Sequence, residues 1–247
     1  ILVCSTGETD SSGVFIYDNL PGYEYVDVEY DTYVWKHNAR GKAIKTVNGK
    51  KVCRFAQPKM DVVSGIIGEK AIMPSILEEL LEARSATRKL IPKQTDDFMK
   101  NILDKRQLGY KVTANSLYGQ CGAKTSSFYE IDVAASTTAT GRKLLLYAKR
   151  VVEETYGNAE CQTSKYGVVN TRAETVYGDT DSAFFTFNLA DKDGTPIRGK
   201  QALEITIELA QQLGELASSF LKAPHSLVYE KTIMPFCLLR KKGYVGI

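Results

Sequence analysis

The sequence has little of the chemistry that metal clusters and disulfide frameworks need. Its five cysteines are scattered through 247 residues and never stand in C-x-x-C spacing. An odd, dispersed set of cysteines is typical of a reducing compartment, so neither a disulfide framework nor a zinc site is expected. Histidine occurs only twice, as His37 and His225, which argues against imidazole catalysis and histidine-ligated metals.

Long apolar runs and a strong charge of one sign are missing as well. No apolar run approaches the roughly 20 residues that a membrane-spanning helix needs, and no basic-then-apolar secretory signal opens the chain. The net charge of +3 is too small to indicate a polyanionic partner by itself. With 43% hydrophobic and 25% charged residues, the composition is that of a globular protein. We expect an intracellular protein without a membrane partner.

Residues 1–57 alternate short β-prone runs with turn residues. The runs are Gly13–Tyr17, Tyr25–Val34 and Lys50–Phe55. The Asn48-Gly49 pair lies between Lys45–Val47 and Lys51–Cys53, and such a pair is a strong signal for a two-residue hairpin turn. The pattern predicts a small antiparallel sheet.

From Gly68 the apolar residues recur at a helical period. A first helix is expected to tolerate Pro74 in its first turn and to stop before Pro92. After a short link, Thr95 or Asp96 is the expected N-cap of a second helix that runs to about Tyr118. Two long helices joined by a short link form an antiparallel helical hairpin.

The polar face of this helical hairpin carries cations. Arg84 and Arg88 are four residues apart and share a face of the first helix. Along the second helix, steps of four, four and three residues give one face to Gln107, Lys111, Asn115 and Tyr118. Such fixed cations are suited to gripping phosphates. A solvated surface with ordinary charges has the same pattern, so both interpretations stay open.

The second half of the chain reads as two more helices and two hairpins. A third helix is expected from about Ala134 to Tyr156 and a fourth over Gly199–Leu221. The polar residues 157–172 read as a loop. A basic turn at Arg240–Lys242, flanked by strand-like residues, predicts a hairpin near the end of the sequence.

The stretch T-V-Y-G-D-T-D-S-A-F-F-T-F (Thr175–Phe187) predicts the other β-hairpin, with Asp179 and Asp181 at or beside its turn. Paired carboxylates on rigid strands are what a hard divalent cation such as Mg²⁺ requires. An ordinary aspartate-rich turn has the same pattern, so the rest of the sequence must decide between the two.

Three motifs resemble those of family B DNA polymerases and occur in that family's order. Lys111–Gly119 resembles the K-x-x-x-N-S-x-Y-G motif of the fingers. Tyr177–Ser182 resembles the Asp-Thr-Asp motif of the palm, and Arg240–Gly246 is similar to the basic K-K-x-Y motif. The text I-L-E-E-L-L-E-A-R also resembles the first fingers helix of the polymerase delta-like and large DNA virus branch. Each motif alone is weak, but four in register over about residues 60–247 are specific.

The resemblance implies an α+β right-hand polymerase fold. Its palm would be an antiparallel sheet with packed helices, and its fingers an antiparallel helical hairpin. On this interpretation residues 1–57 are a β-rich palm-associated segment and residues 58–122 are the fingers. Residues 123–247 are the palm with the aspartate hairpin, ending at the start of the thumb.

The resemblance also implies roles for individual residues. Asp181 would bind catalytic Mg²⁺, and Asp179 would be its partner carboxylate. Glu230 looks like a palm carboxylate near this metal site. The residues implied to bind the incoming nucleotide are Arg84, Arg88, Lys111, Asn115 and Tyr118. Those implied to follow the primer–template DNA are Lys241, Lys242 and Tyr244.

The implied reaction is template-directed nucleotidyl transfer from a dNTP to a primer 3′-hydroxyl, with two Mg²⁺ ions in the complete enzyme. The implied partners are primer–template DNA, dNTPs and a processivity factor bound elsewhere in the full-length chain. A viral member of the family would act in the host nucleus or cytoplasm.

One departure from the family pattern is large. The family's other metal aspartate belongs to a D-x-x-S-L-Y-P motif ahead of the fingers, and residues 1–67 contain nothing like it. Asp10-Ser11-Ser12 and Asp18-Asn19-Leu20 lack the Tyr-Pro that would follow. Exonuclease motifs and a full thumb are missing too. We therefore expect an internal fragment that does not polymerise alone. The smaller departure at Gly243, where the family often has a larger residue, is not expected to matter.

Two alternatives remain at this point. D-T-D-S-A resembles the D-x-D-x-T/V nucleophile motif of aspartate-dependent phosphatases, although that motif follows an apolar strand and precedes a helix. A β-type run follows it in this sequence. The other alternative is a polymerase-like DNA-binding module that has lost activity, against which the intact pair of Asp179 and Asp181 argues.

Overall fold

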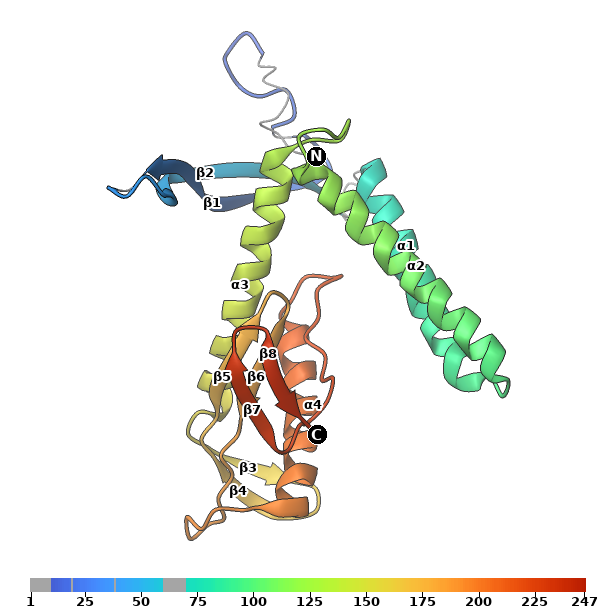
Figure 1. The fold of residues 1–247 in the computed structure, drawn as a ribbon, viewed down its shortest axis with the longest axis vertical. Helices are drawn as coiled ribbons and strands as arrows, with labels where there is room; N and C mark the ends of the chain where they lie inside the picture. Colours follow the sequence, from blue (N-terminus) through green and yellow to red (C-terminus); the bar gives the residue numbers. More distant parts are fainter. Residues whose placement is uncertain (1–9, 19, 38, 60–69) are drawn as a thin grey trace. The chain divides into compact units, whose positions relative to one another are not determined.

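The computed structural model describes residues 10–18, 20–37, 39–59 and 70–247, so Cys4 and Gly68 lie outside the described residues (Figure 1). In these ranges the elements, in chain order, are β1 (Tyr23–His37), β2 (Ala43–Pro58), α1 (Ile72–Leu90), the 3₁₀ turn η1 (Ile91–Lys93), α2 (Asp97–Gly122), α3 (Ile131–Tyr156), β3 (Ala159–Thr163), β4 (Gly167–Thr171), β5 (Glu174–Asp179), β6 (Ser182–Thr186), α4 (Gly199–Ser219), β7 (Phe236–Arg240) and β8 (Gly243–Gly246). The strands pair two by two into antiparallel hairpins. This is the α+β class that the sequence predicts. The chain divides into two compact units, residues 1–140 and 141–247.

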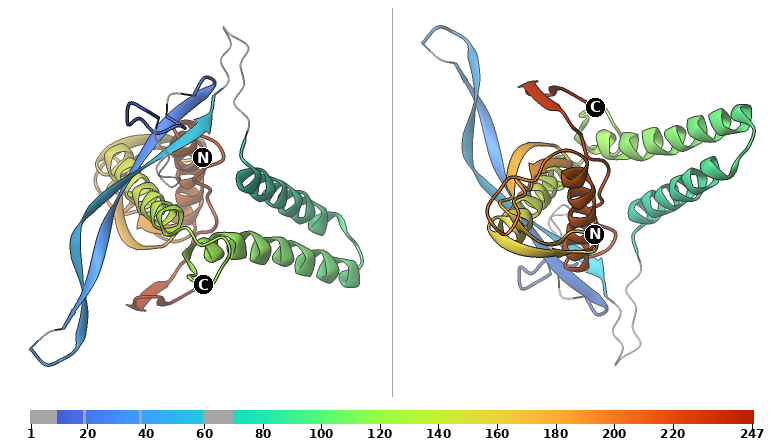
Figure 2. Two further views of the ribbon diagram at one scale, coloured as in Figure 1. Left: turned by 90° about the horizontal axis from the view of Figure 1, so that it is seen from above. Right: turned by 90° about the horizontal axis from the view of Figure 1, so that it is seen from below.

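Strands β1 and β2 form a long antiparallel ribbon, which Figure 2 shows as a twisted pair of strands. The hairpin turn predicted at Asn48-Gly49 is wrong, because the ribbon turns between His37 and Ala43. Asn48 is instead the extra residue of a β-bulge, and Gly49 adopts φ +148°, which suits glycine. A turn at Asn48-Gly49 would forfeit most of this ladder, so the non-local pairing overrides the local turn signal.

Residues 10–18 form turns with one isolated bridge position, not the strand predicted over Gly13–Tyr17. The Asp10 side chain explains the difference. Its Oδ1 accepts hydrogen bonds from the backbone N–H groups of Ser12 at 2.8 Å and Val14 at 3.0 Å. Such a side chain offers the backbone an alternative to a sheet ladder.

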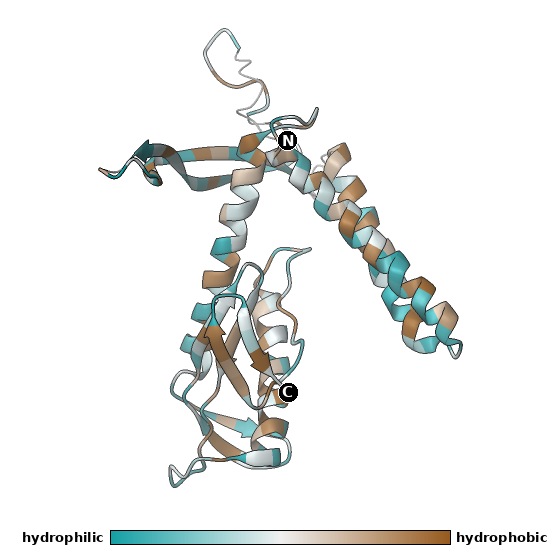
Figure 3. Cartoon of the chain, viewed as in Figure 1, coloured by the Kyte–Doolittle hydropathy of each residue, from teal (hydrophilic) through white to brown (hydrophobic). Residues whose placement is uncertain are grey.

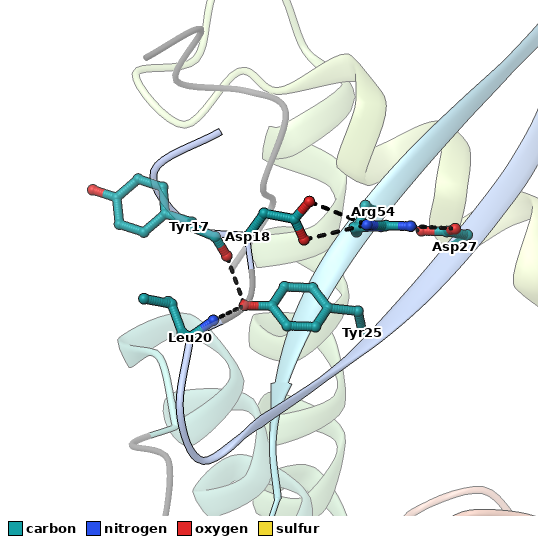
Figure 4. Close-up of polar contacts among 6 residues, drawn as sticks. All are labelled: Tyr17, Asp18, Leu20, Tyr25, Asp27 and Arg54. Atoms are coloured by element: carbon teal, nitrogen blue, oxygen red, sulfur yellow. Dashed lines mark hydrogen bonds and ion pairs between the residues drawn. The ribbon is translucent and has the colours of Figure 1, made fainter. Parts of the chain in front are cut away.

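The base of the ribbon is held to the preceding turns by Tyr25. Its hydroxyl accepts a hydrogen bond from the Leu20 backbone N–H at 2.7 Å and donates one to the Tyr17 carbonyl at 2.7 Å (Figure 4). One hydroxyl therefore satisfies two backbone groups and fixes where the ribbon begins.

The ribbon is also tied to the first turn of α3 through Asp132. The Tyr30 hydroxyl donates to Asp132 Oδ1 at 2.6 Å, and Lys51 forms an ion pair with Asp132 Oδ2. Burial raises the pKa of Asp132, but the hydrogen bonds from Lys51 and Tyr30 outweigh it and hold the pKa below its ordinary value. Burial, together with Asp132, also raises the pKa of Tyr30. The contact is therefore between the ionised Asp132 carboxylate and two hydrogen-bond donors, the Lys51 ammonium and the Tyr30 hydroxyl.

Replacing Asp132 with asparagine is expected to lower the free energy of unfolding by about 1–3 kcal/mol at neutral pH, because Lys51 and Tyr30 lose their charged acceptor. The folded-state pKa of Asp132 is depressed, so its contribution is complete above the ordinary aspartate pKa of about 3.9 and is lost as pH falls through the lower folded value. The free energies of unfolding of the wild-type protein and of Asp132→Asn, measured at a series of pH values, should therefore converge in acid.

Asp97→Asn is the matched control, because Asp97 pairs with Lys100 on α2 but its side chain is 93% exposed. It should change the free energy of unfolding by less than about 0.5 kcal/mol at every pH. If the difference in free energy of unfolding between the wild-type protein and Asp132→Asn keeps its size down to strongly acidic pH, the ionised Asp132 carboxylate is not the source of the stabilisation.

Helices α1 and α2 form the predicted antiparallel hairpin. Asp96 is the N-cap of α2 and accepts a hydrogen bond from the Phe98 N–H at 3.0 Å, as the sequence predicts. Helix α2 continues to Gly122, beyond the end expected near Tyr118. Cys121 in this last turn is buried, and a Cβ at Gly122 would lie 3.6 Å from the Ala134 Cβ of α3. Packing thus offsets the low helix propensity of glycine.

In residues 141–247, α3, α4, β3, β4 and β6 contribute to one hydrophobic core. Its most deeply buried members are Val152, Val169, Phe187, Ile205, Leu209 and Leu213. Figure 3 shows the apolar residues of this unit in brown, with a clear example on β7. Among the described residues, no helix has the length and apolar character needed to cross a membrane.

The loop predicted over residues 157–172 is wrong, because β3 and β4 form a hairpin there. Its inward residues include threonines, and both Thr163 and Thr171 are buried. Their hydroxyls donate to backbone carbonyls, that of Thr163 to Gly167 at 2.8 Å and that of Thr171 to Ala159 at 3.1 Å. A strand that buries satisfied threonines lacks the apolar alternation from which strands are recognised in a sequence.

Candidate active site

The β5–β6 hairpin has the form that the sequence predicts. Asp179 pairs with Ser182 at the end of the ladder, and Thr180 and Asp181 make the turn. Thr180 has φ +54°, a left-handed conformation that a β-branched residue rarely adopts. Strain of this kind costs on the order of 1–3 kcal/mol and gathers at functional sites. It lies here between the two candidate carboxylates.

Four aromatic rings join this hairpin to the β7–β8 hairpin, which lies beside it in Figure 1. They are Tyr177 and Phe184 from β5 and β6, and Phe236 and Tyr244 from β7 and β8. The ring centroids of Phe184 lie 5.4 Å from Phe236 and 5.0 Å from Tyr244, and Tyr177 lies 6.4 Å from Tyr244. Aromatic pairs at such separations contribute about 0.5–1.5 kcal/mol each beyond their buried area. The basic turn is therefore fixed relative to the aspartate turn.

Lys242 makes the direct link between the two turns. Its backbone N–H donates to the Tyr177 hydroxyl at 2.9 Å, and its Nζ lies 3.1 Å from Asp179 Oδ2. The Asp179 carboxylate raises the pKa of Lys242, first through this hydrogen bond and then through its charge. The sequence assigned Lys242 to DNA and Asp179 to metal, but it did not predict that the two touch.

The other face of the β5–β6 hairpin packs on α3 and the core. A Cβ at Gly178 would lie 3.3 Å from Cδ2 of Leu145, so glycine lets the strand approach the helix closely. Phe185 packs edge to face against Phe187 at 5.6 Å between ring centroids. Contacts on both faces make the hairpin a rigid support for its turn.

The donors of the aspartate turn suit Mg²⁺ in kind. The Asp179 side chain is 25% exposed and Asp181 is exposed, so carboxylate oxygens reach solvent. Mg²⁺ is commonly held by one or two carboxylates, with water and substrate phosphates completing its octahedron. In the described part of the chain no three Asp, Glu, His or Cys side chains are arranged to hold a metal ion. Glu230 is exposed in the segment between α4 and β7, and its metal-proximal role stays a prediction.

The helical hairpin brings part of the predicted phosphate-gripping face together. Arg84 Nε of α1 donates to Gln107 Oε1 of α2 at 3.2 Å. A pocket of about 350 Å³ on α1 is lined by Leu81, Arg84, Ser85, Arg88 and Lys89. Lys89 was not singled out from the sequence, because it is adjacent to Arg88 and does not fit the step of four residues.

The predicted face of α2 is solvent-accessible. Lys111, Asn115 and Tyr118 are all exposed, and the Tyr118 hydroxyl lies 3.0 Å from the Thr138 hydroxyl of α3. This contact fixes the Tyr118 ring at the C-terminal part of α2. The helical face belongs to residues 1–140 and the aspartate turn to residues 141–247.

Comparison with known proteins gives a consistent result. The sequence model of DNA polymerase family B matches residues 30–247. A DNA polymerase of Phaeocystis pouchetii virus is 57% identical over 95% of this chain and 22% of its own length. A DNA polymerase of Pyramimonas orientalis virus is 39% identical over 93% of this chain and 20% of its own. The DNA polymerase delta catalytic subunit of Candida albicans is 35% identical over 72% of this chain and 15% of its own. The chain thus spans about a fifth of the length of the viral relatives.

Proposed function

Because the chain belongs to DNA polymerase family B, we propose that it forms the central part of a DNA-directed DNA polymerase that transfers nucleotides from dNTPs to a primer 3′-hydroxyl. The observation that supports this most directly is the pair of hairpins that carries Asp179, Asp181 and Lys242. It places a lysine beside a carboxylate at the turns of two packed hairpins, and phosphoryl transfer depends on charges fixed in this way.

Asp179 and Asp181 would hold Mg²⁺ in this enzyme. Bound Mg²⁺ supplies positive charge that stabilises charge developing on the phosphoryl oxygens. The two aspartates supply part of the cage, and further oxygen ligands would come from outside residues 1–247 or from Glu230. We expect residues 1–247 alone to be inactive, since they lack the D-x-x-S-L-Y-P motif.

The α1–α2 hairpin would act as the fingers, within residues 58–122, and bind the incoming dNTP. Arg84, Arg88 and Lys111 would neutralise its triphosphate, Asn115 would lie along the nucleotide site, and Tyr118 would lie against the nascent base pair. Charge-assisted contacts from a rigid helix face fix the position of the phosphates as well as their charge.

The rest of the chain would form the palm and its approach to the thumb, with residues 1–57 associated with the palm. Lys241, Lys242 and Tyr244 on the β7–β8 turn would follow the primer–template DNA. The ion pair between Lys242 and Asp179 supports this division of labour, because it brings a phosphate-binding cation to the edge of the metal carboxylates. A processivity factor would bind elsewhere in the full-length chain.

The antiparallel β5–β6 hairpin does not favour a phosphatase, whose nucleophilic aspartate follows a strand and precedes a helix. An inactive DNA-binding module remains the second candidate. The strained Thr180 between two accessible carboxylates favours an active site over it. Similarity to viral polymerases supports an intracellular place of action, in the host nucleus or cytoplasm.

The test is primer extension by the full-length protein, supplied with Mg²⁺, a primed template and one dNTP at a time. The proposal expects only the dNTP complementary to the next template base to be added, and no addition when EDTA replaces Mg²⁺. Binding of the primed template without any extension would favour the inactive module, and release of phosphate without extension would favour a phosphatase.

A further inference from the structure

The two halves of the β1–β2 ribbon differ in charge. At the base, cations are matched by carboxylates: Arg54 donates to Asp27 at 2.8 Å and to Asp18 at 3.2 Å (Figure 4), and Lys50 lies 2.6 Å from Glu29. We define the ribbon tip as Tyr33–His37 together with Ala39–Val47. The charged residues of the tip are all cationic and exposed, namely Lys36, Arg40, Lys42 and Lys45. The tip segments thus contain four cationic residues and no acidic residue.

The tip also exposes large aromatic side chains. Trp35, the single tryptophan of the sequence, is 69% exposed, and Tyr33 is 41% exposed. Residues two apart along a strand share a face, so both rings point to the same side of the ribbon. They are roughly 7 Å apart along the strand, too far to stack on each other.

A cation lies among these rings. Trp35 pairs with Lys45 across the ribbon and Tyr33 pairs with Val47, so Lys45 is on the same face as both rings. Its Nζ lies 4.0 Å from the centroid of the Tyr33 ring. Rings interleaved with cations on one face combine two kinds of contact, stacking for bases and charge for phosphates.

We propose that this face of the ribbon tip binds single-stranded DNA, with bases stacked on Trp35 and Tyr33 and the backbone held by the surrounding cations. Single-strand binding proteins combine a positive groove with aromatic platforms in this way. Duplex DNA offers phosphates but hides its base faces, which would leave the rings without a role. The core of a protein interface is usually depleted in lysine, which disfavours a protein partner.

The inference concerns binding at a surface other than the aspartate turn. The test measures DNA binding and not nucleotidyl transfer. Single-strand binding at the tip can therefore be absent while nucleotidyl transfer is present, and it can be present while nucleotidyl transfer is absent. The full-length protein is titrated into a labelled oligo-dT and into a blunt duplex of equal length, and fluorescence anisotropy reports binding. The double variant Tyr33→Ala/Trp35→Ala should bind oligo-dT at least about 10-fold more weakly, since stacking is worth about 1–3 kcal/mol per base. Its affinity for the duplex should change less than about 2-fold.

Phe98→Ala is the matched control, because Phe98 on α2 is also 69% exposed. It should leave oligo-dT binding unchanged. The variant Lys45→Ala should lower the slope of log affinity against log salt for oligo-dT by up to about 0.7, which corresponds to one lost phosphate contact.

Direct contact is tested by photocrosslinking the wild-type protein to an oligonucleotide that contains 5-iododeoxyuridine. The proposal expects adducts on the peptide that contains Tyr33 and Trp35, lost on competition with unlabelled oligo-dT but not with duplex. Adducts confined to other peptides would overturn it. Equal loss of single-strand and duplex binding in the aromatic variant would also overturn the proposal. So would an aromatic variant that loses a protein partner but keeps its affinity for oligo-dT.

Discussion

Replacing Asp181 with asparagine in the full-length protein is expected to slow primer extension by at least about 100-fold while the affinity for primed template stays within about 2-fold. Asparagine keeps the size of the side chain but removes the charge that would hold Mg²⁺. The charge stabilisation at stake is several kcal/mol, and each 1.36 kcal/mol is a factor of ten in rate. DNA affinity should persist, because a polymerase holds its duplex mainly through backbone phosphates.

Asp193→Asn is the control for this experiment, since Asp193 is an exposed aspartate in a turn of the same unit. Rates come from single-turnover extension and affinities from anisotropy, with circular dichroism to confirm that each variant folds. If Asp181→Asn extends primers at the rate of the control, Asp181 does not hold the catalytic metal. A folded variant that no longer binds DNA would show a role in binding instead.

The second large effect is expected at Lys111. Lys111→Ala should raise the KM for dNTP by roughly 10- to 100-fold, because a hydrogen bond from a charged group contributes about 1.5–3 kcal/mol. The rate at saturating dNTP should fall less, unless the contact forms only in the transition state. Steady-state extension at varied dNTP concentration separates the two effects.

Lys105→Ala is the matched control, because Lys105 is also exposed on α2 but lies on a different face of the helix. Its KM and rate should stay close to wild type. An unchanged KM and rate in Lys111→Ala would remove Lys111 from the triphosphate site and leave Arg84 and Arg88 as the remaining candidates.

The sequence predicts correctly those helices and hairpins that are determined by local patterns of apolar and polar residues. The helical hairpin follows from apolar residues at a 3.6-residue period with a cap at Asp96, and the aspartate hairpin follows from β-prone residues around a polar turn. The failures have non-local causes. At Asn48-Gly49 a good turn signal was overruled by strand pairing on both sides, and in β3–β4 the inward threonines hide the strand pattern.

The candidate site divides in the same way. Asp179, Asp181 and the cations of the fingers-like hairpin could be picked out because motif spacing places them on turns and helix faces. The contact between Lys242 and Asp179 joins residues far apart in the sequence, and no local pattern encodes it. The alternation of Tyr177 with Asp179, and of Phe184 with Ser182, was the available signal. It shows which hairpin face carries the aromatic rings, but not which strand pair covers that face.

The bulge at Asn48 changes which side of the ribbon the odd-numbered residues of β2 face. Below it, the odd-numbered residue Lys51 pairs with Tyr30 on the side that meets Asp132. Above it, the odd-numbered residue Lys45 pairs with Trp35, which is on the opposite side. One inserted residue therefore inverts the phase of β2 halfway along its length. If Asn48 paired with Tyr33 instead of bulging out, Lys45 would pair with Lys36 on the side that meets Asp132, so this bulge decides whether the rings and Lys45 share a surface.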